Sequence, residues 1–209
     1  MSSLLERILR TLNSDYVTAA ELAALLPIND NARHAQIKRA LAKGYLTSLK
    51  RGVYRKAGYL EKSKPHPFEI AYYLIWPSYV SLESALSYHG LIPETIYMTT
   101  CVTTQRSKTI QNELGHFEYK KMPNQNFFID VQRVQNENGV FYVANPWKAL
   151  CDYVYCHNKS WVNIEPANES LRLDLDELPA LDLKLSKKLI DYYSCKRVSS
   201  FLKGVRREY

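Results

Sequence analysis

The chain has 209 residues, of which 46% are hydrophobic, and its formal net charge is +7 at pH 7. A chain of this length can bury a substantial core, either as one large domain or as two small ones. No apolar run approaches membrane-spanning length, and the first fifteen residues alternate apolar and polar side chains, so we expect neither a membrane span nor a secretory signal.

The cysteine pattern argues against disulfides and metal. The four cysteines, at positions 101, 151, 156 and 195, form no CxxC pair and are too irregularly spaced for a disulfide framework. Cys151, Cys156 and His157 lie close in sequence, but no second ligand pair completes a zinc pattern. We therefore expect buried free thiols, no metal site and a cytoplasmic protein.

Positive charge is concentrated at the two ends of the chain. The first 64 residues contain 12 Lys or Arg and 5 Asp or Glu, residues 65–182 contain 8 and 14, and residues 183–209 contain 8 and 2. A compact basic segment at the N-terminus suits a polyanionic partner such as nucleic acid. A solvated basic surface without such a partner would give the same counts.

The apolar spacing at the N-terminus predicts two short helices. A stripe of leucine and isoleucine marks the first, which ends near Asn13. Thr18 and Glu21 have the spacing of a capping box, with Val17 as a hydrophobic staple, and they open a second helix that stops at Pro27. A turn follows at residues 27–30.

A basic amphipathic helix comes next, over residues 31–44. Ile37 and Leu41 fall on one face of this helix, the polar and basic side chains fall on the other, and Gly44 supplies the C-terminal stop. Two short strands then flank a glycine-containing turn at residues 50–52, as in a β-hairpin. This order of elements predicts a winged helix-turn-helix domain over residues 1–60.

In such a domain the basic helix enters the major groove of DNA. Gln36 is suited to read adenine and Arg39 to read guanine, while Lys38 and Lys43 are suited to contact phosphates. The first-turn residues are candidates for base contacts, although capping or surface roles fit them equally, with Asn31 as a possible N-cap. The hairpin cations would reach the DNA backbone or the minor groove, or would keep a sheet edge soluble. The predicted DNA contacts are Asn31, Arg33, His34, Gln36, Lys38, Arg39, Lys43, Lys50, Arg51 and Arg55.

A second, larger domain of mixed α+β class is predicted over residues 67–209, after a boundary at residues 57–66 that is rich in small, charged and proline residues. Helices are expected at 68–76 and 81–89. Strands are expected at 96–104, 117–121, 127–134 and 140–143. Asn145 and Pro146 then have the positions of a helix cap and first helical residue.

Several segments of this second domain resemble a known family. The stretch YVSLESALSYHGLIPETIY, a strand followed by VTTQRSK, then GHFEYKK and NPWKALCDYVY, is similar to the AbiEi-type antitoxins of bacterial type IV toxin-antitoxin systems, which take part in phage defence. Those proteins carry an N-terminal winged helix-turn-helix before a domain of this kind. The resemblance covers most of the chain and is most specific at SLESALSYHGLIP and Arg106.

The resemblance implies an autorepressor with two roles. Its N-terminal domain would bind inverted repeats in operator DNA, and its C-terminal domain would neutralise a cognate nucleotidyltransferase-type toxin, with or without direct contact. The candidates for toxin neutralisation, or for a second basic patch, are Arg106, Lys108, Lys120 and Lys121. The C-terminal cations at 187, 188, 196, 197, 203, 206 and 207 would form a solvated helix face or extend the DNA footprint.

Other functions fit the same residues less directly. A winged-helix regulator with a ligand-sensing or dimerisation domain shares the N-terminal evidence. A metal-dependent enzyme would have to use acidic residues such as Asp130 and the run around Asp174, but no phosphate-binding glycine loop accompanies them. We therefore expect no catalytic activity and no cofactor. The sixteen tyrosines mostly have core spacing and are expected to pack internally rather than to stack on bases.

Overall fold

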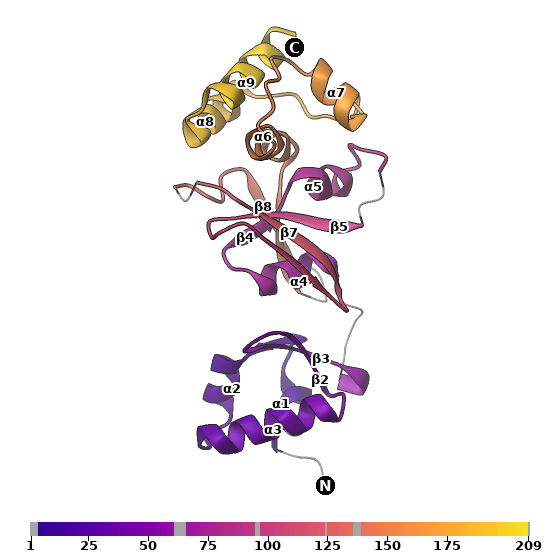
Figure 1. Cartoon of the computed structure of the whole chain (residues 1–209), viewed down its shortest axis with the longest axis vertical. Helices are drawn as coiled ribbons and strands as arrows, with labels where there is room; N and C mark the ends of the chain where they lie inside the picture. Colours follow the sequence, from indigo (N-terminus) through magenta and orange to yellow (C-terminus); the bar gives the residue numbers. More distant parts are fainter. Residues whose placement is uncertain (1–3, 61–65, 95–96, 124, 136–138, 209) are drawn as a thin grey trace. The chain divides into compact units, whose positions relative to one another are not determined.

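The computed structural model describes residues 4–60, 66–94, 97–123, 125–135 and 139–208. The predicted mixed α+β class is confirmed (Figure 1). The described residues form two compact units. Unit 1 contains those up to Leu74 together with residues 135, 139 and 140, and unit 2 contains the rest. Among the described residues, no helix has the length and apolar character needed to cross a bilayer.

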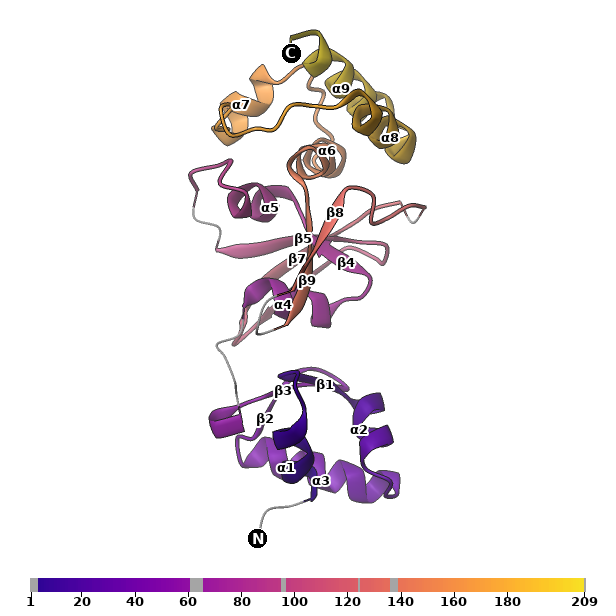
Figure 2. The same cartoon turned by 180° about the vertical axis from the view of Figure 1, so that it is seen from behind.

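Unit 1 contains a three-stranded antiparallel sheet in the order β1-β3-β2. Figures 1 and 2 show α1, α2 and α3 on one side of this sheet. Leucine, isoleucine and valine side chains from these helices and from the sheet form most of the core of unit 1. Its elements are α1 (Leu4–Thr11), β1 (Tyr16–Thr18), α2 (Ala19–Leu25), α3 (Asp30–Ala42), β2 (Leu46–Lys50), β3 (Val53–Lys56), η1 (Gly58–Leu60) and α4 (Pro67–Leu74).

The capping signals of unit 1 are partly as predicted. Thr18 and Glu21 form the predicted capping box at α2. The N-cap of α3 is Asn29, whose side-chain oxygen accepts a hydrogen bond from the N–H of Ala32 at 2.8 Å. A capping role for Asn31 is therefore wrong, because the helix begins before it and leaves Asn31 exposed in the first turn.

Helix α4 packs on unit 1, so the packing places the end of this unit later than the predicted boundary before residue 67. The rings of Tyr16 and Tyr73 stack at 4.1 Å with an angle of 12° between their planes. The hydroxyl of Tyr16 donates to Oε2 of Glu69 at 3.2 Å, and burial raises the pKa of this tyrosine. Its strand neighbour Val17 belongs to the core formed with α1, α2 and α3. Side chains on successive residues of a strand point to opposite faces, so helices cover both faces of the small sheet.

Unit 2 contains a six-stranded mixed sheet in the order β6-β7-β5-β4-β9-β8. The strand β5 is parallel to β7 and antiparallel to β4, and β4 is parallel to β9. The elements are β4 (Ser78–Val80), α5 (Leu82–Tyr88), β5 (Met98–Thr103), β6 (Lys108–Asn112), β7 (Gly115–Lys121), β8 (Val131–Gln135), β9 (Val140–Ala144), α6 (Pro146–Cys156), α7 (Glu165–Leu171), α8 (Leu183–Tyr193) and α9 (Lys196–Glu208).

Helix α6 is the centre of unit 2. It lies between the sheet and a layer formed by α7, α8 and α9 (Figures 1 and 2). Every residue from Trp147 to Val154 is buried, because neighbours cover the helix on all sides. Pro146 occupies the predicted first position, but Asn145 makes no side-chain cap and instead donates from Nδ2 to Oδ1 of Asp130 at 3.0 Å.

The strand predicted over residues 127–134 begins only at Val131. The preceding residues form a turn, in which Asn126 and Asp130 have positive φ angles of 51° and 52°. These values do not fit an extended strand. The phenylalanines of this turn contact other aromatic rings, as described below.

Candidate nucleic-acid interface

The exposed face of α3 brings together five of the predicted DNA contacts. Ile37 and Ala40 are buried on the opposite face, which fixes the orientation of the helix. Two alanines, Ala35 and Ala42, are also exposed and leave the face without bulky apolar side chains. The five exposed predicted contacts are Asn31, His34, Lys38, Arg39 and Lys43.

This face carries positive charge that the chain does not neutralise. Within the part of the chain that the structure describes, Lys38, Arg39 and Lys43 form no ion pair. The ammonium of Lys43 lies 5.9 Å from the ring centroid of Tyr45, a cation–π contact that leaves the charge in place. The face is therefore suited to bind a polyanion.

Arg33 is engaged within the chain instead of lying on this face. Its Nη1 lies 2.7 Å from Oδ1 of Asp30, and its Nη2 donates to the carbonyl of Ile28 at 3.0 Å. Only 13% of its side chain is exposed. The guanidinium of Arg33 stabilises the turn before α3. The position of this side chain therefore does not support the predicted base contact.

Gln36 also has an internal partner. Its Oε1 accepts a hydrogen bond from the backbone N–H of Leu5 at 3.2 Å. That N–H belongs to the first turn of α1, where backbone donors have no partner within the helix. The position of Gln36 therefore indicates a cap on α1 in place of the predicted adenine contact.

Of the three hairpin cations predicted to contact DNA, Lys50 and Arg51 are exposed and Arg55 is buried. Arg51 is exposed at the turn, as predicted. The side-chain Nζ of Lys50 donates to the carbonyl of Leu74 at the end of α4, at 2.7 Å. Arg55 is 4% exposed, and its Nη2 lies 3.7 Å from Oδ2 of Asp15. A DNA contact by Arg55 is not compatible with this buried position, and Lys50 is directed toward α4.

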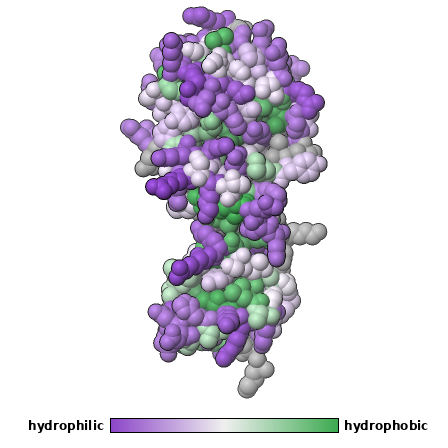
Figure 3. All heavy atoms as spheres, viewed as in Figure 1, coloured by the Kyte–Doolittle hydropathy of each residue, from purple (hydrophilic) through white to green (hydrophobic). Residues whose placement is uncertain are grey.

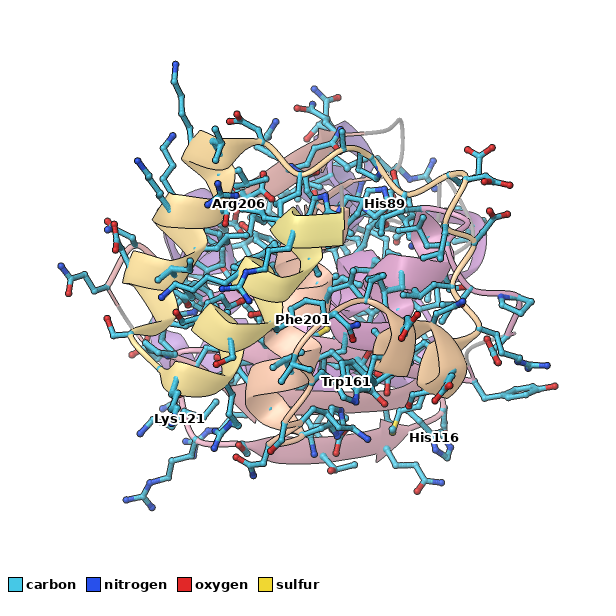
Figure 4. All side chains as sticks on the ribbon, turned by 90° about the horizontal axis from the view of Figure 1, so that it is seen from above. His89, His116, Lys121, Trp161, Phe201 and Arg206 are labelled. Carbon is cyan, nitrogen blue, oxygen red and sulfur yellow. The ribbon has the colours of Figure 1, made fainter. Side chains whose placement is uncertain are left out.

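In unit 2, three of the four cations predicted for toxin neutralisation or for a second basic patch, Arg106, Lys108 and Lys121, lie exposed at one end of the large sheet. Lys121 pairs in register with Thr103, and its N–H donates to Oγ of Ser107 at 2.9 Å. Arg106 and Lys108 flank that serine, and both are exposed. Lys120 differs, because its Nζ lies 2.7 Å from Oε1 of Glu118. Figure 4 shows Lys121 and His116 at opposite ends of the sheet.

All the cations of α8 and α9 except Arg197 are exposed to solvent. Val198, Phe201, Leu202 and Val205 of α9 are buried, whereas Arg197 is half-buried. Hydrophilic residues predominate over α8 and α9 on the face drawn in Figure 3. The exposed cations on these helices are Lys184, Lys187, Lys188, Lys196, Lys203, Arg206 and Arg207.

Sequence reasoning missed a buried polar cluster in unit 2. Lys148 and Asp152 of α6 are both 0% exposed, and Nζ of the lysine lies 2.6 Å from Oδ1 of the aspartate. The hydroxyl of Tyr193 in α8 donates to the same oxygen at 2.6 Å. Ser81 and Tyr79 donate to Oδ2 of Asp152 at 2.6 and 3.1 Å. The cluster thus joins α6, α8 and the β4 region.

The electrostatics of this cluster follow from its burial. Burial lowers the pKa of Lys148, although the Asp152 carboxylate acts in the opposite direction. Burial and the nearby Asp152 charge raise the pKa of Tyr193 well above its ordinary value. The available signal was the spacing of Lys148 and Asp152, four residues apart in an otherwise apolar helix, which places them on the same face.

The alternatives that involve metal or disulfides find no site in the described parts of the chain. No group of three or more His, Cys, Asp or Glu side chains there has a geometry suited to hold a metal ion. Cys101, Cys151, Cys156 and Cys195 are free, and the first two are buried. Burial raises the pKa of Cys101 and of Cys151, which makes these thiols poor nucleophiles.

Comparisons of the chain with protein-family models and with curated proteins gave no match.

Proposed function

We propose that unit 1 is a winged helix-turn-helix that binds double-stranded operator DNA through the exposed face of α3. The element order α1-β1-α2-α3-β2-β3 fits this fold, with α3 as the recognition helix and β2-β3 as a short wing. The observation that carries the proposal is the group of Lys38, Arg39 and Lys43, which are exposed and form no ion pair among the described residues, on and at the end of a helix whose opposite face is buried.

The positions of the side chains narrow the set of contacts. Arg39 is the candidate for reading guanine, and Lys38 and Lys43 are the candidates for phosphate contacts. Asn31 and His34, in and just after the first turn of α3, are exposed and are the candidates for contacts with base edges. From the hairpin, Arg51 remains a candidate because it is exposed, whereas Nζ of the exposed Lys50 donates to the carbonyl of Leu74.

We propose further that the whole chain is an autorepressing antitoxin of the AbiEi type, whose unit 2 counters a nucleotidyltransferase-type toxin. The support is the resemblance of the segments around Ser81, Arg106 and Lys148 to that family, together with the DNA-binding character proposed for unit 1. The exposed cations Arg106 and Lys108, with Lys121, are the candidates for that second role.

The test of DNA binding is a gel-shift titration of the full chain with the DNA upstream of its own gene. Arg39→Ala is compared with Arg7→Ala, which removes an exposed cation from α1 and leaves α3 intact. Weaker binding by the α3 variant alone is expected. Equal binding by both variants and the parent would exclude α3 as the reader.

The test of the antitoxin role is co-expression with the neighbouring gene, if that gene encodes a nucleotidyltransferase. We expect the neighbour alone to arrest growth and this chain to relieve the arrest. Arrest that persists when both proteins are made would refute the antitoxin role and leave DNA binding untouched.

One observation favours the alternative of a ligand-sensing regulator. A surface hollow of about 520 Å³ in unit 2 is lined by polar and aromatic side chains, including Asn126, Lys188, Asp191 and Tyr192. A hollow of this size could hold a small polar molecule. Operator affinity that depends on a cellular metabolite, in the absence of any toxin, would support this function instead.

A further inference from the structure

A stack of aromatic rings reaches the surface of unit 2. Trp76 is 49% exposed and Phe128 is 37% exposed. Their ring centroids lie 5.6 Å apart, with 28° between the ring planes. Tyr142 of β9 completes the group, and its ring centroid lies 5.9 Å from that of Trp76 and 5.2 Å from that of Phe128. We call these three residues the aromatic platform.

The platform is anchored to the interior. Phe128 contacts Phe127, with ring centroids 5.0 Å apart, and Phe127 lies 4.8 Å from the buried ring of Tyr79. The hydroxyl of Tyr79 donates to Asp152 in the buried polar cluster. A chain of packed rings therefore links the surface to the centre of the unit, and such packing holds the exposed rings in a fixed orientation.

The basic end of the sheet lies beside this platform. The side-chain amide of Gln105 donates to the backbone carbonyl of Trp76, and Arg106 is the next residue in the chain. Arg106, Lys108 and Lys121 are all exposed, and among the described residues none of the three forms an ion pair. Exposed rings and unneutralised cations thus share one region of the surface.

This combination matches the chemistry of single-stranded nucleic acid. A base stacks on an aromatic ring whatever its sequence, while lysine and arginine neutralise the phosphates of the strand. The bases of a duplex are already stacked inside the helix and would not reach Trp76. A protein partner would cover apolar rings, but a group of exposed cations that form no ion pair among the described residues favours a partner that carries regular negative charge.

We infer that the platform and the cations Arg106, Lys108 and Lys121 form a binding surface for single-stranded nucleic acid, separate from the α3 face. Trp76 stacks on a base, and the three cations neutralise phosphates. The inference does not depend on the antitoxin role or on operator binding by α3.

The experiment measures fluorescence anisotropy of labelled twelve-nucleotide oligouridylate and oligothymidylate, and of a duplex of the same length, titrated with the full chain. Trp76→Ala should weaken binding of the single strands by about five- to one-hundred-fold. Trp76→Phe, which keeps a ring, should retain most of the affinity. Tighter binding of the uridylate or of the thymidylate would identify the strand as RNA or DNA.

Tyr97→Ala is the matched control, since Tyr97 is 92% exposed and lies outside the platform. It should bind single strands like the parent. The triple variant Arg106→Ala, Lys108→Ala, Lys121→Ala changes only exposed side chains. It should lower the slope of log affinity against log salt concentration by about two, since each neutralised phosphate contributes roughly 0.7 for single strands.

Three results would overturn the inference: a parent chain that binds the duplex but not the single strands, equal binding by Trp76→Ala and Tyr97→Ala, or an unchanged salt slope in the triple variant. Arg39→Ala separates this site from the α3 site, because it should leave single-strand binding unchanged. If Trp76→Ala does not fold, as judged by circular dichroism, the triple variant and Trp76→Phe decide the outcome.

Discussion

The side chain of Gln36 accepts a hydrogen bond from the backbone N–H of Leu5 at 3.2 Å, and so ties the middle of α3 to the start of α1. This bond distinguishes the side of α3 that holds the unit together from the side that faces solvent. Gln36→Ala should lower the free energy of unfolding by about 1 kcal/mol, the usual contribution of such a bond.

Operator affinity of folded Gln36→Ala should equal that of the parent. Urea denaturation gives the stability, and gel shifts at a temperature where both proteins are folded give the affinity. Lys38→Ala is the matched control, for which we expect the reverse: unchanged stability and weaker binding. A loss of affinity without a loss of stability in Gln36→Ala would restore it as a base contact.

Removal of Arg39 and removal of Lys43 should affect operator binding in different ways. Arg39→Ala should weaken operator binding by about 1–3 kcal/mol and relax specificity at one base position. Lys43→Ala should weaken all sequences alike and lower the salt slope by about one. Gel shifts on the operator and on single-base variants, at several salt concentrations, measure both effects. Binding like that of the parent in both variants would remove α3 from the interface.

Removal of Arg55 should act on stability and not on DNA contact. The guanidinium is 4% exposed and lies beside the buried carboxylate of Asp15. Its loss should lower the free energy of unfolding by about 1–3 kcal/mol, because the buried Asp15 carboxylate loses this cation while Lys56, whose Nζ lies 3.9 Å from Oδ1 of Asp15, remains. Arg51→Ala, at the exposed turn, should be neutral within about 0.5 kcal/mol. Thermal melts of both variants test this contrast, and equal melting temperatures would contradict it.

Alkaline pH should destabilise unit 2 through Tyr193. Burial and the Asp152 carboxylate raise the pKa of Tyr193 in the folded chain above the ordinary value of about 10. The folded chain therefore keeps this proton while the unfolded chain releases it, so the stabilising effect is complete below about pH 10 and is lost at higher pH.

Tyr193→Phe should be less stable at pH 8, because it loses the hydrogen bond to Asp152, yet its stability should fall less steeply above about pH 10. Chemical denaturation between pH 8 and 11 provides the comparison. Parallel profiles for parent and variant would mean that Tyr193 does not titrate on unfolding.

A small residue is required at Gly204 in α9. A Cβ atom at this position would overlap the backbone carbonyl of Val162. Gly204→Ala should therefore lower the free energy of unfolding by about 1–3 kcal/mol or more, although alanine favours helices. Lys203→Ala, one residue earlier and exposed, should change stability little. Thermal melts compare the two variants. Equal melting temperatures would mean that α9 does not pack against the backbone of Val162 as described.

The elements that could be predicted were those with a local sequence signal, whereas no bounds were predicted for α7, α8 and α9. The apolar spacing of α1, the capping box of α2 and Pro146 at the start of α6 are local features that sequence displays directly. The three-residue strands β1 and β4 are too short to show alternation, and β6 is mostly polar. Their existence depends on pairing with distant strands, which no local pattern encodes.

The candidate DNA face was predictable only in part, for the same reason. The exposed positions of α3 follow from helical periodicity. The partners of Gln36 and Arg55 come from other elements, so spacing within the helix or hairpin could not identify them. The ion pair of Arg33 with Asp30, three residues earlier in α3, is by contrast compatible with helical spacing. The burial of Arg55 depends on β1, which was not predicted, because Tyr16 of β1 lies opposite Arg55 in the sheet.

The packing of α4 on the small sheet affects how the DNA-binding unit can be isolated. A fragment ending at residue 60 would lack the partners of Tyr16 and Lys50, and it would present a tyrosine ring and an open sheet face to other molecules. Such a surface invites self-association. A fragment ending after Leu74 retains those partners, so it is the better choice for crystallisation with operator DNA.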